Sequence, residues 1–189
     1  MIDMGRVEES FEQSRIALAL DPLNTAVTLH MGWHFLMAGQ LDQAIAQYEA
    51  TLRLDPSYSA AYTQMTQAYA LSGRFDEAVT AWNKRLELPQ APDSLWMAAI
   101  IAARRGHTRE ATRMVSSMIV DAKRGDQSAY ALATVLAQLS RKDEALQWLA
   151  LAIKRRDAEV TSLKMDPFLS GLRGDPRFAA LIRQVGLHP

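Results

Sequence analysis

Apolar residues recur at intervals of three and four along most of the chain, which is the pattern of amphipathic helices. Within residues 24–57, Met31 and Phe35 mark one such face, and Ala44, Ile45 and Tyr48 mark a second. The pattern predicts helix pairs over 24–38 with 41–54, 58–71 with 75–87, 93–105 with 108–121, and 126–139 with 142–155. A lone helix is expected over 5–20 and a short final helix over 176–185.

A repeat underlies this pattern. Glycines at predicted turns follow one another at spacings of 34, 34 and 33 residues: Gly5, Gly39, Gly73 and Gly106. Five residues after each glycine stands a small residue: Ser10, Ala44, Ala78 and Ala111. A fifth copy has Ser140 in place of the glycine and Ala145 as the small residue. Asp-Pro pairs end the first two copies, at Pro22 and Pro56.

Each recurring residue has a physical reason. Glycine tolerates the positive φ of a tight turn between helices, and proline ends one helix and restarts the next. A small residue lets two antiparallel helices cross closely, and a bulky residue four positions later fills the adjoining space. The sequence therefore predicts an all-α fold of antiparallel helix pairs.

These positions resemble the tetratricopeptide repeat. The second copy matches the family pattern at Met31-Gly32, Phe35, Ala44, Tyr48 and Pro56. The third matches at Tyr62, Met65, Tyr69, Ala78, Trp82 and Pro89, and the fifth at Leu132-Ala133, Leu136, Ala145 and Leu149. The fourth departs from the pattern, with Ala98-Ala99, Ala102, Ala111, Val115 and no closing proline.

The resemblance implies a right-handed superhelical solenoid in a single domain, residues 1–189. We expect a half repeat at 5–23, full repeats at 24–57, 58–91, 92–125 and 126–157, and a C-terminal cap at 158–189. The half repeat "GRVEESFEQSRIALALDP" favours a chain cut from a longer protein. The tail departs from the 34-residue period, and its apolar face is expected to cover the open end of the last repeat: Phe178, Leu181, Ile182 and Val185.

The tail, "DPFLSGLRGDPRFAALIRQVGL", also resembles the C-terminal end of tetratricopeptide regions in large bacterial signalling proteins. In those proteins the repeats commonly accompany a winged-helix DNA-binding domain, a serine/threonine kinase domain or a cyclase domain. The resemblance implies that this chain is the regulatory, sensory or oligomerisation portion of such a regulator.

Composition narrows the possible functions. The chain has 21 basic and 21 acidic residues, so its net charge demands neither a nucleic-acid nor a membrane partner. Residues 1–94 carry six basic and twelve acidic side chains, however, and residues 95–189 carry fifteen basic and nine acidic. The absence of cysteine excludes disulfides and cysteine nucleophiles. No apolar run is long enough for a membrane span, and the first ten residues lack a signal-peptide pattern.

Candidate chemistry is sparse. His30 and His34 have a metal-compatible spacing on a predicted helix, but no glutamate stands between them and no third ligand is evident. The acidic pairs Asp76-Glu77 and Asp143-Glu144 begin predicted helices, where negative charge is favoured by the helix dipole. The basic pair Arg104-Arg105 ends a predicted helix, where the helix dipole favours cations. We therefore expect no enzyme activity, no cofactor and no bound metal.

The resemblance leaves the concave face, lined by the first helix of each pair, as the expected binding surface for a protein or peptide. Its expected residues are Leu29, Trp33, Met37, Gln64, Gln67, Trp96, Ile100, Arg104, Tyr130, Thr134 and Gln138. Aromatic anchors with polar neighbours are typical of binding surfaces. Some family members clamp a C-terminal carboxylate with cationic and amide side chains, but the matching positions here are Leu29, Trp33, Thr63, Gln67, Trp96 and Ile100.

The partner can be another domain of the same polypeptide. A homodimer through the apolar face of the N-terminal half repeat is also expected. The expected location is the cytoplasm, or the periplasm if the chain is fused to a membrane-anchored regulator.

Overall fold

The computed structural model describes residues 4–88 and 95–186, and of residues 4–8 only the backbone. Across these ranges the chain is helical and contains no strand, which confirms the all-α prediction. The chain divides into two compact units, Ile2–Asp93 and Ser94–Pro189, called here the N-terminal unit and the C-terminal unit. That both units belong to a single domain stays a prediction. The role of Pro89 as the residue that closes the third copy also stays a prediction, because Pro89 lies outside the described ranges.

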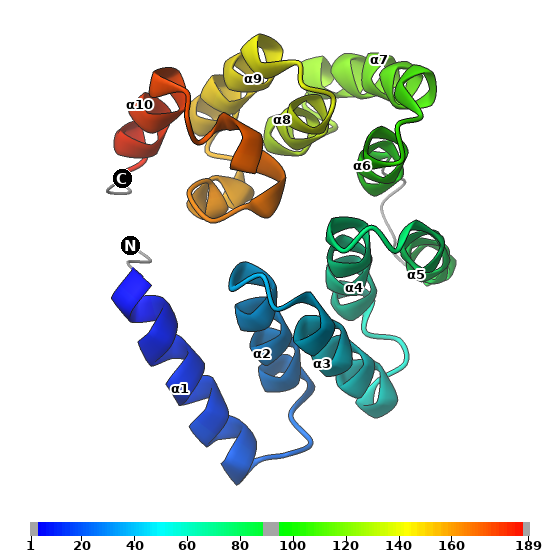
Figure 1. Ribbon diagram of the computed structural model, residues 1–189, viewed down its shortest axis with the longest axis vertical. Helices are drawn as coiled ribbons and strands as arrows, with labels where there is room; N and C mark the ends of the chain where they lie inside the picture. The colour runs from blue at the N-terminus through cyan, green and yellow to red at the C-terminus, as the bar shows by residue number, and fades with distance from the viewer. Residues whose placement is uncertain (1–3, 89–94, 187–189) are drawn as a thin grey trace. The chain divides into compact units, whose positions relative to one another are not determined.

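The N-terminal unit begins with the single helix α1 (Met4–Leu20), followed by two helix pairs. The first pair is α2 (Thr25–Met37) with α3 (Leu41–Leu54), and the second is α4 (Ser59–Leu71) with α5 (Phe75–Glu87). Each helix contacts the next along the chain, as the blue to green ribbons show (Figure 1). The bounds agree with the predicted helices to within a residue or two, because turn residues between the helices mark where each one ends.

The C-terminal unit contains the pairs α6 (Trp96–Arg104) with α7 (Thr108–Arg124) and α8 (Ala129–Gln138) with α9 (Lys142–Arg155). Two 3₁₀ helices, η1 (Ala158–Ser162) and η2 (Pro167–Leu172), precede the final helix α10 (Pro176–Gln184). Helix η2 packs against α8 and α10 packs against α9 (Figure 1). Asp175 caps α10, since its carboxylate accepts a hydrogen bond from the backbone N–H of Arg177.

The turns between paired helices use the left-handed conformation that the sequence predicts. Gly39, Gly73 and Gly106 have φ values of 74°, 78° and 82°, and Ser140 has a φ of 60° at the equivalent position. At each turn, the N–H groups of this residue and the next bond back to carbonyls at the end of the first helix. Ser140 therefore adopts a conformation that costs a residue with a side chain more than it costs glycine.

The small residues lie where paired helices approach most closely. Ala44, Ala78, Ala111 and Ala145 are all 0% exposed. In the first pair a second small residue is also needed, because a Cβ on Gly32 would overlap the buried ring of Tyr48. The α2–α3 contact therefore has no room for even one methyl group at residue 32.

The tail covers the end of the last helix pair, as predicted, but the segment before α10 contributes to this contact as well as α10 itself. Phe178 and Ile182 of α10 are buried, whereas Leu181 and Val185 are only half-buried. Val160, Leu163, Phe168, Leu169 and Leu172, from the segment before α10, are also buried. Gly174 follows Ser140 by 34 residues, but it does not have the positive φ of the turn glycines, and two 3₁₀ helices stand where a repeat would have its first α-helix. The tail thus packs η2 and α10 on the last helix pair without repeating its structure.

We predict that Gly32→Ala destabilises the protein. Alanine favours the helical state over glycine by about 1 kcal/mol, but overpacking a filled core costs about 1–3 kcal/mol. The free energy of unfolding in urea should therefore fall by about 1 kcal/mol, and by up to about 2 kcal/mol. Gly171→Ala is the matched control, because a Cβ at Gly171 would have nothing within 4 Å. Unchanged stability of the Gly32 variant would contradict the close contact.

We predict that Ser140→Gly stabilises the protein. The substitution removes the cost of a left-handed serine, about 1–2 kcal/mol, and loses about 0.5–1 kcal/mol because glycine gives the unfolded chain more freedom. The net gain should be a few tenths to about 1 kcal/mol in thermal unfolding. Gly106→Ser, at the equivalent turn, should do the reverse. A lower melting temperature for Ser140→Gly would show that the serine side chain stabilises this turn.

Candidate functional site

The predicted binding residues fall on the first helix of each pair, and each unit presents its own set. In the N-terminal unit, Leu29, Trp33 and Met37 lie on α2, and Gln64 and Gln67 lie on α4. All five are half-exposed. In the C-terminal unit the predicted residues lie on α6 and α8: Trp96, Ile100, Arg104, Tyr130, Thr134 and Gln138. The two sets differ sharply in their surroundings.

In the C-terminal unit, three residues expected on an open face lie inside the unit instead. Ile100 and Thr134 are 0% exposed and Tyr130 is 4% exposed. The Nε1–H of Trp96 donates a hydrogen bond to Oγ1 of Thr134 at 2.9 Å, which joins α6 to α8. The burial follows from the position of α8, which has α6 packed against it and the tail helix η2 packed against it as well.

Side-chain hydrogen bonds tie the predicted face to the tail. Nη1 of Arg104 donates to Oε1 of Gln138 at 2.9 Å, and Nε2 of Gln138 donates to the carbonyl oxygen of Phe168 at 2.5 Å. The hydroxyl of Tyr130 donates to Oδ2 of Asp166 at 2.9 Å. Burial, and the nearby Asp166 carboxylate, raise the pKa of Tyr130 above its ordinary value, so the phenol stays protonated and donates. These side chains therefore hold the tail of the same chain.

Asp166 and Phe168 were not expected as partners of this face. Burial raises the pKa of the Asp166 carboxyl, while the hydrogen bonds from the Phe168 N–H and the Tyr130 hydroxyl oppose that rise. The sequence did carry a signal, the Asp-Pro pair at residues 166–167, which marks the start of a short helix. Its partner could not be found from that signal alone.

In the N-terminal unit the equivalent face remains accessible. The Trp33 indole stacks on the His30 imidazole, with ring centroids 5.5 Å apart and an interplanar angle of 3°. Gln67, at the equivalent position of α4, is also half-exposed, whereas Oε1 of Gln64 is shielded from solvent and has no hydrogen-bond partner. The face therefore offers an oriented aromatic ring with apolar and amide neighbours.

The two histidines lie in the contact between α1 and α2. His34 is 3% exposed, and its Nε2 lies 3.4 Å from Oγ of Ser10. Nδ1 of His30 lies 3.0 Å from Oγ of Ser14, and the Phe11 ring meets His34 edge-on. Within the described ranges, no group of three or more histidine, cysteine or acidic residues is placed to hold a metal ion. The pair therefore joins two helices by polar and aromatic contacts.

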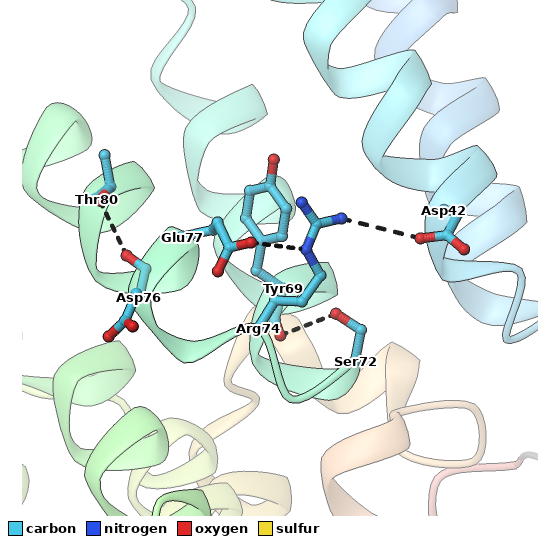
Figure 2. Close-up of polar contacts among 7 residues, drawn as sticks. All are labelled: Asp42, Tyr69, Ser72, Arg74, Asp76, Glu77 and Thr80. Atoms are coloured by element: carbon cyan, nitrogen blue, oxygen red, sulfur yellow. Dashed lines mark hydrogen bonds and ion pairs between the residues drawn. The ribbon is translucent and has the colours of Figure 1, made fainter.

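The candidate acidic pairs form ion pairs at helix starts. Nε of Arg74 donates to Oε1 of Glu77 at 3.0 Å, and its Nη1 lies 3.9 Å from Asp42 of the preceding pair. The guanidinium also lies 4.6 Å from the centre of the Tyr69 ring (Figure 2). Hydrogen bonds from its own backbone and from Arg74 lower the pKa of Glu77.

The fifth copy repeats this arrangement. Arg141 bonds Glu144 at 2.7 Å, and Asp143 meets Arg177 of α10 at 2.8 Å. Glu77 and Glu144 thus pair with an arginine at the start of their own helix, whereas Asp42 and Asp143 form the ion pairs that reach the next repeat or the tail. Such exposed ion pairs contribute little stability individually, typically about 0–1 kcal/mol.

Comparisons with known proteins agree with this architecture. Two family models for the tetratricopeptide repeat match, one over residues 3–59 and one over residues 35–87. The crystal structure of YrrB, described as a TPR protein with an unusual peptide-binding site, is similar in fold, with a TM-score of 0.50 and 14% sequence identity. The match covers 92% of this chain and 98% of that one. No curated protein matches the chain. Among the described helices, none is long and apolar enough to cross a bilayer.

We predict that protonation of His34 destabilises the N-terminal unit. Burial, and then the nearby His30, lower the pKa of His34 from an ordinary 6.5 to about 4. Above pH 6.5 the imidazole is neutral in both states, and the stability is complete. As the pH falls from 6.5 towards 4, the unfolded chain binds the proton first, so stability is lost across that window.

The test is urea unfolding of the wild type and His34→Gln between pH 7 and pH 4. The wild type should lose about 2 kcal/mol more than the variant over this range. His107→Gln is the matched control, because it makes the same substitution at an exposed histidine that directly precedes α7. Parallel pH profiles for wild type and His34→Gln would exclude this histidine as the cause.

Proposed function

We propose that this chain, a tetratricopeptide-repeat protein, is a non-enzymatic protein-interaction module that binds a peptide segment on the α2/α4 face of its N-terminal unit. The observation that carries the proposal is the half-exposed, stacked indole of Trp33, with half-exposed Leu29 and Met37 one turn away on α2 and half-exposed Gln67 at the equivalent position of α4. The description of YrrB, a protein of similar fold, as having a peptide-binding site supports this function.

The chemistry of the face favours a particular kind of peptide. Indole and aliphatic side chains bind apolar anchors, and tryptophan is enriched among the residues that dominate binding energy. The Gln67 amide can both donate to and accept from a peptide backbone. Stacking on His30 limits the motion of the Trp33 ring, so less conformational entropy is lost on binding.

Charge narrows the ligand further. Residues 1–94 carry six basic and twelve acidic side chains, so the surrounding field favours a neutral or basic peptide over an acidic one. The positions that would clamp a terminal carboxylate in some family members are here Leu29, Trp33, Thr63 and Gln67, none of which is cationic. We therefore propose recognition of an internal segment with apolar side chains rather than a free C-terminus.

The alternative function is that of the regulatory, sensory or oligomerisation portion of a larger bacterial signalling enzyme or transcriptional regulator. The tail sequence from "DPFLSGL" onward favours this alternative, because it resembles the C-terminal end of tetratricopeptide regions in such proteins. Under this alternative the same α2/α4 face would bind a neighbouring domain. We propose a cytoplasmic location, or a periplasmic one if the chain is fused to a membrane-anchored regulator.

We predict that Trp33→Ala weakens binding of a selected peptide by about 2 kcal/mol or more, because it removes the central anchor of the face. Peptides would be selected from a random displayed library against the full chain, and affinities measured by titration calorimetry. Trp148→Ala is the matched control, since Trp148 is a half-exposed tryptophan on α9. Circular dichroism should show that both variants stay helical.

Two results would contradict the proposal. One is a peptide that binds wild type and Trp33→Ala equally while Trp148→Ala weakens it. The other is a library that yields no peptide whose binding depends on any residue of the α2/α4 face.

A further inference from the structure

Two leucines at the end of α1 are unusually exposed. Leu20 is 83% exposed and Leu23, three residues later, is 73% exposed. Single exposed apolar residues are common on protein surfaces, but Leu20 follows the exposed Ile16 by one turn of α1, and Leu23 lies in the turn directly after the helix. An apolar cluster of this kind marks a contact surface. It is separate from the α2/α4 face, because it belongs to α1 and the turn that follows.

A hollow lies beside these leucines. It has a volume of about 300 Å³, and its apolar walls are Leu18 and Pro22 from the end of α1 and Ala50 and Leu54 from α3. An engineered cavity of about 150 Å³ in another protein admits a benzene ring, so this hollow has room for a leucine side chain. Protruding leucines and a hollow that can accept them therefore occupy the same region of the surface.

The charges in this region are also complementary. Asp21 lies between the two exposed leucines in sequence, and Arg53 lines the hollow. The Asp21 carboxylate accepts a hydrogen bond from Nδ2 of Asn24 at 3.1 Å. Among the described residues, the structure gives neither Asp21 nor Arg53 an ion-pair partner. Each therefore has its charge available to a neighbouring molecule.

We infer that this surface, called here the Leu20 patch (Leu18, Leu20, Asp21, Leu23, Arg53 and Leu54), forms a two-fold symmetric homodimer. In it, Leu20 or Leu23 of each copy enters the hollow of the other, and Asp21 of each copy pairs with Arg53 of the other. A two-fold interface requires a self-complementary surface, because the same patch serves both copies. The Leu20 patch carries a protrusion and a hollow, and an anion and a cation, which meets that requirement.

A second copy explains these features better than an unrelated partner does. An unrelated partner would need to supply one protrusion, one hollow and two opposite charges, whereas a second copy supplies all of them by symmetry. Each contact also occurs twice, so a modest ion pair or apolar insertion contributes at both sites. The inference does not rest on peptide binding, since it uses a different surface.

The charge pair provides the sharpest test. Sedimentation velocity of the full chain, from about 1 to 500 µM in low salt, should show a monomer–dimer equilibrium in a range typical of weak protein interfaces. Asp21→Arg alone and Arg53→Asp alone should each raise the dissociation constant at least about tenfold, because each places like charges together at two sites. An equimolar mixture of these two variants should form a heterodimer in which both charge pairs are matched.

The apolar contacts are tested in parallel. Leu20→Ser combined with Leu23→Ser should raise the dissociation constant at least about tenfold, and added salt should not restore the dimer. Leu86→Ser is the control, because Leu86 is an exposed leucine on α5, outside the patch, and should leave the dimer intact. Since Leu20 and Leu23 are exposed, their removal should not change thermal stability at low protein concentration, where the chain is monomeric.

Three results would overturn the inference. Wild type that stays monomeric at every concentration excludes the dimer. A dimer that persists in the double leucine variant places the interface elsewhere. Single charge variants that dissociate but fail to recover on mixing exclude the pairing of Asp21 with Arg53 across a two-fold axis.

Discussion

Every helix pair in this protein depends on the close approach of its two helices. The alanine near the start of each second helix is completely buried, and in the first pair the Tyr48 ring occupies space that a Cβ at Gly32 would fill. Because side chains project from fixed directions along a helix, this approach also decides which residues turn inward and which remain exposed. The turns with positive φ at Gly39, Gly73, Gly106 and Ser140 return the chain at the angle that the contact requires.

The same packing rule has opposite outcomes in the two units. In the C-terminal unit, α8 has η2 and its buried side chains packed against the face that would otherwise be open, and Tyr130 and Gln138 bind the tail. In the N-terminal unit, Leu29, Trp33 and Met37 of α2 remain half-exposed. Equivalent positions of a repeat therefore stabilise one unit and present a surface in the other, depending on what packs next to them.

Helix α1 is joined to α2 differently from the paired helices. Ser10 and Ser14 face the two histidines, and Phe11 packs against His34 and Phe35, so polar and aromatic contacts replace the alanine-based approach. One edge of α1 is thus held by groups whose contact depends on protonation, and its end carries the exposed leucines of the Leu20 patch. Contact with α2 and the proposed contact with a second copy use separate parts of the helix.

From the sequence alone, the repeat and apolar spacing determined the helices, their pairing, the turn residues and the stripe of first-helix residues that includes Trp33 and Gln138. These features are local, because they depend on residues at most one repeat apart. Only the tertiary structure decided that Tyr130, Thr134 and Ile100 are buried while Trp33 is not, that Asp166 and Phe168 meet α8, and that a hollow lies beside Leu20. The physical reason is that a helical period assigns a residue to a face, whereas its exposure depends on the elements that pack against that face from elsewhere in the chain.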